Sequence, residues 1–184
     1  MDISFSTVSH MVGVIAYLLL AVFIANRFLR RSTDQTLLVA SLASSAWLAV
    51  LSAQGMGLDI PFYIRYAFEL IRNAAWVDVL YSLLGIKFFP RHRHGKDRFY
   101  ITFSVLALFT VTLFVTLMQG ITQQSFISGY SIVLFQVAIS IVGILLIEQV
   151  WRNASVYSRS GIKYLTIAIA SFFTYDFFMY SDAL

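Results

Sequence analysis

Hydrophobic residues of this 184-residue chain fall into six long runs, which short polar segments separate. The runs cover about residues 9–28, 35–54, 61–88, 99–118, 126–150 and 162–184. Because a helix rises 1.5 Å per residue, about 20 apolar residues cross a bilayer core of about 30 Å. The pattern therefore predicts an all-α fold, in which residues 1–184 form one polytopic bundle of six transmembrane helices.

The composition agrees with a membrane class. Hydrophobic residues make up 59% of the chain and charged residues only 12%, whereas soluble domains carry about 25% charged residues. The chain has no cysteine, which excludes disulfides and thiolate chemistry. A nucleic-acid-binding protein would need a solvated basic face with its own fold, and the sequence contains none. We therefore expect contact with a lipid bilayer and none with nucleic acid.

The distribution of basic residues predicts the orientation. Eleven of the thirteen lie in three alternate segments between the runs or within two residues of them. These eleven are Arg27, Arg30, Arg31, Lys87, Arg91, Arg93, Lys96, Arg98, Arg152, Arg159 and Lys163. The N-terminus and the segments 55–60 and 119–125 contain neither Lys nor Arg. By the positive-inside rule, the basic segments are cytoplasmic and the N-terminus is outside.

The third run is the least apolar, since it contains two arginines and two acids. If this run did not cross the membrane, the first two basic segments would lie on opposite sides. Only a crossing third helix keeps all three basic segments in the cytoplasm. We therefore expect it to span the bilayer with its polar groups inside the bundle.

Polar residues of the third run are candidates for sensing a signal. Arg65, Glu69, Arg72 and Trp76 follow one another at spacings of four, three and four, which places them on one helix face. A charge at the centre of a membrane helix costs roughly 2.5–3.5 kcal/mol, and Glu69 can pair with either arginine. The group is either a structural ion pair or a polar pocket for an anionic or polar signal. Asp78 points away from this face and needs a partner from another helix, or a proton.

The last run combines acids with aromatic residues. Asp176 and Tyr180 lie one turn apart, and Tyr175 and Asp182 share another face. One interpretation is an aromatic belt at the outer membrane interface. The other is an acid held by tyrosine hydroxyls in a pocket that suits a cationic or amphiphilic ligand.

Motifs for catalysis are missing from the sequence. It contains no phosphate-binding glycine loop, no HExxH and no GxSxG. His92 and His94 stand in a basic turn without a nearby cysteine and are a weak metal signal. We therefore expect no catalytic residue, metal or cofactor in this chain. A small transporter or permease, with the third run lining a path, is an alternative function, and a membrane-embedded enzyme is a third.

Three segments near the end carry a resemblance. EQVWRN at 148–153, GIKYL at 161–165 and YDFFMYSDAL at 175–184 resemble the membrane region of the PrsK family. These are sensor histidine kinases linked to exosortase and PEP-CTERM protein sorting. The resemblance implies the multi-helix signal-input module of a bacterial two-component system in the inner membrane.

Further expectations follow from that resemblance. It implies a homodimer and cytoplasmic GAF and histidine kinase domains beyond Leu184. The kinase would use ATP and Mg²⁺ and pass a phosphoryl group to a response regulator that controls exopolysaccharide and protein-sorting genes. Six crossings from an outside N-terminus would leave Leu184 outside. We therefore expect a truncated seven-helix sensor, with one more helix before the kinase.

Overall fold

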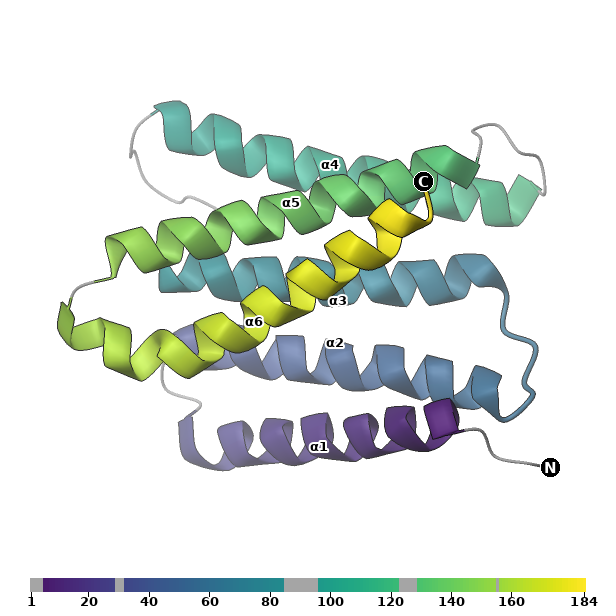
Figure 1. Cartoon of the computed structure of the whole chain (residues 1–184), viewed down its shortest axis with the longest axis horizontal. Helices are drawn as coiled ribbons and strands as arrows, with labels where there is room; N and C mark the ends of the chain where they lie inside the picture. The colour runs from purple at the N-terminus through teal and green to yellow at the C-terminus, as the bar shows by residue number, and fades with distance from the viewer. Residues whose placement is uncertain (1–4, 29–31, 85–95, 123–128, 155) are drawn as a thin grey trace. The chain divides into compact units, whose positions relative to one another are not determined.

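The computed structural model of the chain contains six α-helices (Figure 1). It describes residues 5–28, 32–84, 96–122, 129–154 and 156–184. The helices are α1 Phe5–Phe28, α2 Ser32–Gly55, α3 Phe62–Leu83, α4 Lys96–Thr122, α5 Gly129–Asn153 and α6 Val156–Asp182. Within these ranges there is no strand, which confirms the predicted all-α class and the six helices.

Several helix bounds differ from the predicted runs. α4 and α6 begin earlier than predicted, at Lys96 and Val156, and α4 continues to Thr122. α3 ends at Leu83, and the rest of its predicted run beyond residue 84 lies outside the described residues. The bounds differ because hydropathy identifies only the lipid-compatible part of a helix. The helical backbone hydrogen bonds continue into the polar residues that flank this part.

Among the residues that the structure describes, four helices are long and apolar enough to cross a membrane. The apolar stretches are Phe5–Asn26 in α1, Gln35–Gly55 in α2, Ser131–Asn153 in α5 and Ile162–Asp182 in α6. α4 contains a shorter apolar stretch, Phe103–Met118. α3 is not among the helices that are apolar enough to cross. The helices thus support a membrane protein. The count of six crossings and the orientation stay predictions.

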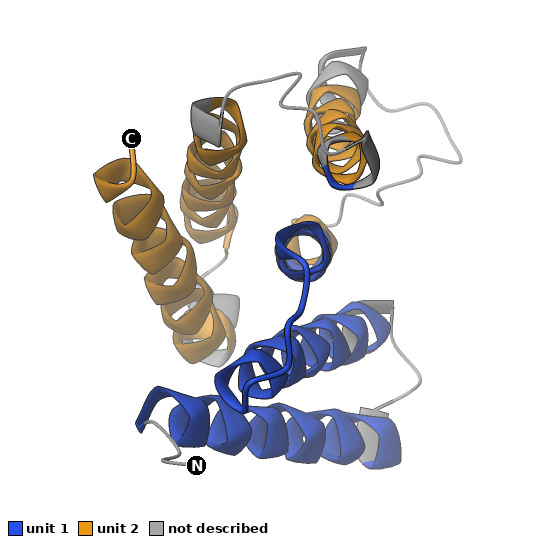
Figure 2. Cartoon of the chain, turned by 90° about the vertical axis from the view of Figure 1, so that its right-hand side faces the viewer, with its two compact units in different colours: residues 1–79, 120–122 blue, residues 80–119, 123–184 orange. Residues whose placement is uncertain are grey.

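The chain divides into two compact units (Figure 2). The first contains residues 1–79 and 120–122, and the second contains residues 80–119 and 123–184. In the first unit, α1 packs closely against α2. The Ser45 hydroxyl lies 3.5 Å from the Val14 carbonyl oxygen, and a Cβ at Gly13 would come within 2.8 Å of Leu48 Cδ1. Small residues therefore let the two backbones approach, as is common between helices in lipid.

In the second unit, α5 packs against α6 through one face of each helix. The buried residues of α6 follow one another at spacings of three and four, and they are Thr166, Ile169, Phe173, Asp176 and Tyr180. The Phe173 ring is fully buried, and a Cβ at Gly143 of α5 would come within 2.5 Å of it. Gly143 therefore leaves the space in which this ring packs against the α5 backbone.

Large apolar side chains are exposed along the described helices. On α1 alone, Val12, Ile15 and Leu19 are 59–65% exposed at spacings of three and four. A soluble monomer rarely exposes such a continuous apolar stripe. A lipid environment accounts for it, because hydrocarbon chains solvate these side chains.

Candidate functional site: a polar cluster on α3

Three polar residues are buried within little more than one turn of α3. Glu69, Arg72 and Asn73 are 4%, 3% and 0% exposed. Their spacing of three and four residues places Glu69 on the same side of the helix as the other two. Burial of a charge is costly without a partner, so the contacts of Arg72 decide how this arrangement is stabilised.

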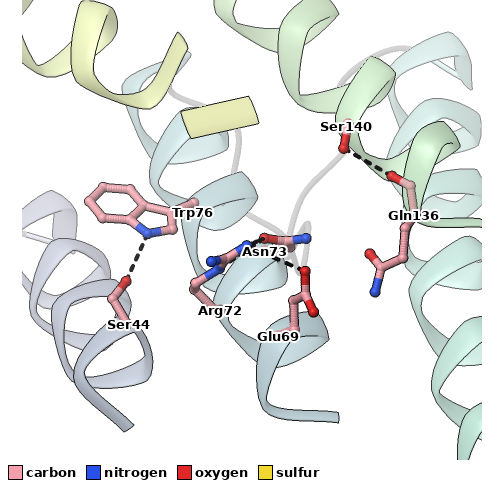
Figure 3. Close-up of polar contacts among 7 residues, drawn as sticks. All are labelled: Ser44, Glu69, Arg72, Asn73, Trp76, Gln136 and Ser140. Atoms are coloured by element: carbon pink, nitrogen blue, oxygen red, sulfur yellow. Dashed lines mark hydrogen bonds and ion pairs between the residues drawn. The ribbon is translucent and has the colours of Figure 1, made fainter. Parts of the chain in front are cut away.

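Arg72 has two polar partners on its own helix (Figure 3). Its Nε and Nη2 atoms donate hydrogen bonds of 3.2 and 3.1 Å to Asn73 Oδ1. Its Nη2 atom also lies 3.8 Å from Glu69 Oε1. At that distance the two groups form an ion pair, but they are too far apart for a hydrogen bond. The guanidinium is therefore hydrogen-bonded to a neutral amide and attracted by a nearby carboxylate.

A third partner of Arg72 comes from α2. The guanidinium carbon lies 3.8 Å from the centre of the Trp47 ring system. A cation over an indole face is attracted by the negative face of the ring, by about 2 kcal/mol or more where water is excluded. This contact links the charge on α3 to α2 within the first unit.

A hydrogen-bonded chain joins the same two helices one turn further along. Trp76 Nε1 donates to Ser44 Oγ at 3.0 Å (Figure 3). Ser44 Oγ in turn donates to the Ala40 carbonyl oxygen at 2.8 Å. The indole of α3 is thus tied through one hydroxyl to the backbone of α2. We call the following residues the polar cluster: Ser44, Trp47, Glu69, Arg72, Asn73 and Trp76.

Two donors of the polar cluster are not satisfied by the residues that the structure describes. Asn73 Nδ2 and Trp47 Nε1 are both buried, and neither has a hydrogen-bond partner in those ranges. A buried donor that lacks a partner costs about 1–3 kcal/mol. The polar cluster is therefore only partly satisfied within the described chain.

The structure brings together three of the four residues that the sequence placed on one face of α3. Glu69, Arg72 and Trp76 are buried in the polar cluster. Arg65 is only half-buried, and its guanidinium carbon lies 5.1 Å from the ring centre of Tyr66. Of the two arginines that could pair with Glu69 by spacing, Arg72 forms the ion pair, at 3.8 Å.

Sequence reasoning missed three members of the polar cluster. Asn73 could have been suspected, because an amide next to a buried arginine is a natural acceptor for it. Ser44 and Trp47 gave no such signal. They lie on another helix, and only the packing of α2 against α3 brings them to Trp76 and Arg72.

Asp78 behaves differently from the polar cluster. It is half-buried, and no residue in the described ranges hydrogen-bonds to its carboxyl group. The expected partner from another helix is therefore not found among those residues.

The α6 candidates divide into two pairs. Asp176 and Tyr180 are buried, at 2% and 5% exposure, while Tyr175 is 66% exposed and Asp182 is also exposed. The two buried residues are one turn apart, and the two exposed residues are seven positions apart. Because Tyr175 points away from the buried side, only Tyr180 shares a face with Asp176. The exposed Tyr175 and Phe178 fit an aromatic belt at a membrane interface.

Metal binding has no support in the described part of the chain, where no three His, Asp or Glu residues are grouped to hold an ion. His92 and His94 lie outside the described residues. The chain matches no model of a known protein family, no curated protein and no solved structure.

Proposed function

We propose that this chain is the membrane signal-input module of a bacterial two-component histidine kinase. In this proposal it lies in the inner membrane with its N-terminus outside. It passes an extracellular or membrane signal to a dimeric kinase whose response regulator controls exopolysaccharide and PEP-CTERM sorting genes. The resemblance of residues 148–184 supports the class, and the apolar helices support the location.

The observation that carries the sensing role is the partly satisfied polar cluster. Ionisable groups inside a membrane are costly and usually functional. A purely structural lock would be expected to satisfy its buried donors, yet Asn73 Nδ2 and Trp47 Nε1 have no partner among the described residues. Such a cluster favours a second arrangement in which these donors are bonded.

In this proposal, a change in the polar cluster is transmitted from α3 to α2. Arg72 and Trp76 lie one turn apart on α3, and both contact α2. A rotation of α3 against α2 would break the contact with Trp47 and the hydrogen bond to Ser44 together. The two helices would then have two packing arrangements without a stable intermediate. A signal would act by shifting the populations of these two arrangements.

The test uses the full-length protein in cells and follows transcription of the regulated genes. Glu69→Gln removes the buried carboxylate beside Arg72, and Asp176→Asn removes the buried acid of α6. We expect each to change basal or signal-dependent output several-fold. Asp182→Asn is the matched control, because it neutralises an exposed acid of the same helix, and it should leave output unchanged.

The amount of each variant in the membrane must equal that of the parent. If transcription is then unchanged in both buried-site variants, Glu69 and Asp176 have no role in signalling. Solute uptake by the purified chain in proteoliposomes, abolished by Glu69→Gln, would instead favour the transporter alternative.

A further inference from the structure

Two cations and two aromatic residues flank the junction of α5 and α6 in the sequence. The apolar stretch of α5 ends at Asn153, and that of α6 begins at Ile162. Trp151 and Arg152 lie within two residues of the first limit, and Lys163 and Tyr164 lie within two residues of the second. All four therefore lie at the polar edges of the two apolar stretches, which is where the hydrocarbon core gives way to headgroups if both helices span the bilayer.

The side chains of these four residues are accessible. Trp151 and Tyr164 are 40% and 78% exposed, and Lys163 is exposed as well. The Arg152 side chain is 70% exposed, although its Nη1 atom lies 3.4 Å from Glu148 Oε1. Indole and phenol rings favour this level of a membrane, because one end of each is apolar and the other is polar.

The remaining interactions leave both cations able to bind an anion. The Glu148–Arg152 pair is exposed to solvent, and such pairs are weak and easily exchanged. Lys163 Nζ lies 5.9 Å from the centre of the Tyr164 ring, at the outer limit of a cation–π contact. Neither interaction buries its cation.

The other end of the α5–α6 pair provides an internal contrast. Residues 126–133 and 172–184 contain no Lys or Arg, and the second of these segments contains two acids. Between the two ends, Leu145 of α5 and Ile167 of α6 are 54% and 51% exposed and can contact acyl chains. The surface thus combines cations, interfacial aromatic rings and, deeper, apolar side chains on the same two helices.

We propose that Arg152 and Lys163, flanked by Trp151 and Tyr164, bind the phosphate headgroup of an anionic phospholipid. A phospholipid fits better than a soluble anion, because its acyl chains would also cover the apolar side chains below the cations. Anionic lipids are attracted to basic residues at the cytoplasmic face of membrane proteins. This inference does not depend on the proposed signalling function.

The test measures quenching of tryptophan fluorescence by brominated lipids in vesicles of phosphatidylglycerol and phosphatidylcholine, with the bromine on one lipid at a time. The part of the signal that Trp151→Phe removes reports the lipid beside residue 151. We expect phosphatidylglycerol to be preferred there. The preference should fall about fivefold with Arg152→Gln or Lys163→Gln alone and about twenty-fold with both.

Two control variants make the result decisive. Arg27→Gln with Arg30→Gln removes the same charge from another basic segment and should keep the preference. Arg152→Lys with Lys163→Arg should also keep it, because both side chains change while both charges remain. No preference in the parent, or an undiminished preference in the double glutamine variant, would overturn the proposal. An equal loss in the Arg27 and Arg30 control would overturn it too, because it would indicate general surface charge.

Discussion

Replacing Arg72 with methionine is expected to lower the free energy of unfolding by about 3–5 kcal/mol. The substitution keeps a long side chain but removes the cation that lies 3.8 Å from the buried Glu69 carboxylate. It also removes the two hydrogen bonds to Asn73 Oδ1 and the charge over the Trp47 ring. Unfolding by a denaturing detergent, followed by tryptophan fluorescence in lipid-like micelles, measures the loss.

Two further variants test whether the loss of stability comes from the buried ion pair or from removing any charge on α3. Arg65→Met removes an arginine from the same helix, but this residue is only half-buried, so it should cost less than half as much. Combining Arg72→Met with Glu69→Gln removes both charges and should recover much of the stability, because a neutral replacement of a buried pair is often tolerated. A double variant as unstable as Arg72→Met alone would contradict the assigned role of the pair.

Replacing Phe173 with alanine is the second change with a large expected effect. The ring is fully buried between α6 and α5, and Gly143 leaves no side chain that could fill the space after its removal. Helices in lipid gain little from hydrophobic transfer, so the loss comes mainly from the cavity. At about 24 cal/mol per Å³, a void of about 100 Å³ would cost about 2–3 kcal/mol.

Phe178 is the matched control, since it is the same residue type on the same helix but is 65% exposed. Phe178→Ala should cost less than about 0.5 kcal/mol, because lipid can occupy the space. The same detergent-unfolding measurement compares the two. Equal losses at both positions would show that α5 and α6 do not pack through the face that contains Phe173.

The sequence was sufficient to predict the helices and the unusual character of α3. Six apolar runs correspond to six helices, and the spacing of Glu69, Arg72 and Trp76 correctly placed them on one face. These features depend on the period of a single helix, which local sequence reveals. Helix ends were less well predicted, as at Val156, because hydropathy does not mark where backbone hydrogen bonding begins.

Contacts between helices could not be predicted. Spacing alone left Glu69 with two possible arginines, and it could not reveal that Arg72 lies over Trp47, 25 positions earlier in the chain. The same holds for the hydrogen bond from Trp76 to Ser44. Such pairings depend on the rotation and register of one helix against another, and a single sequence with no alignment contains no direct signal for either.

Labelling of single cysteines tests most directly whether α3 crosses the membrane with its charges inside the bundle. The chain contains no cysteine, so Asp59→Cys before α3 and His92→Cys after it each introduce a unique thiol. In right-side-out spheroplasts, a membrane-impermeant maleimide should label Asp59→Cys at once and His92→Cys only after permeabilisation. Labelling of both thiols from the same side, with the cysteine-free parent unlabelled, would show that α3 does not span the bilayer and would contradict the account.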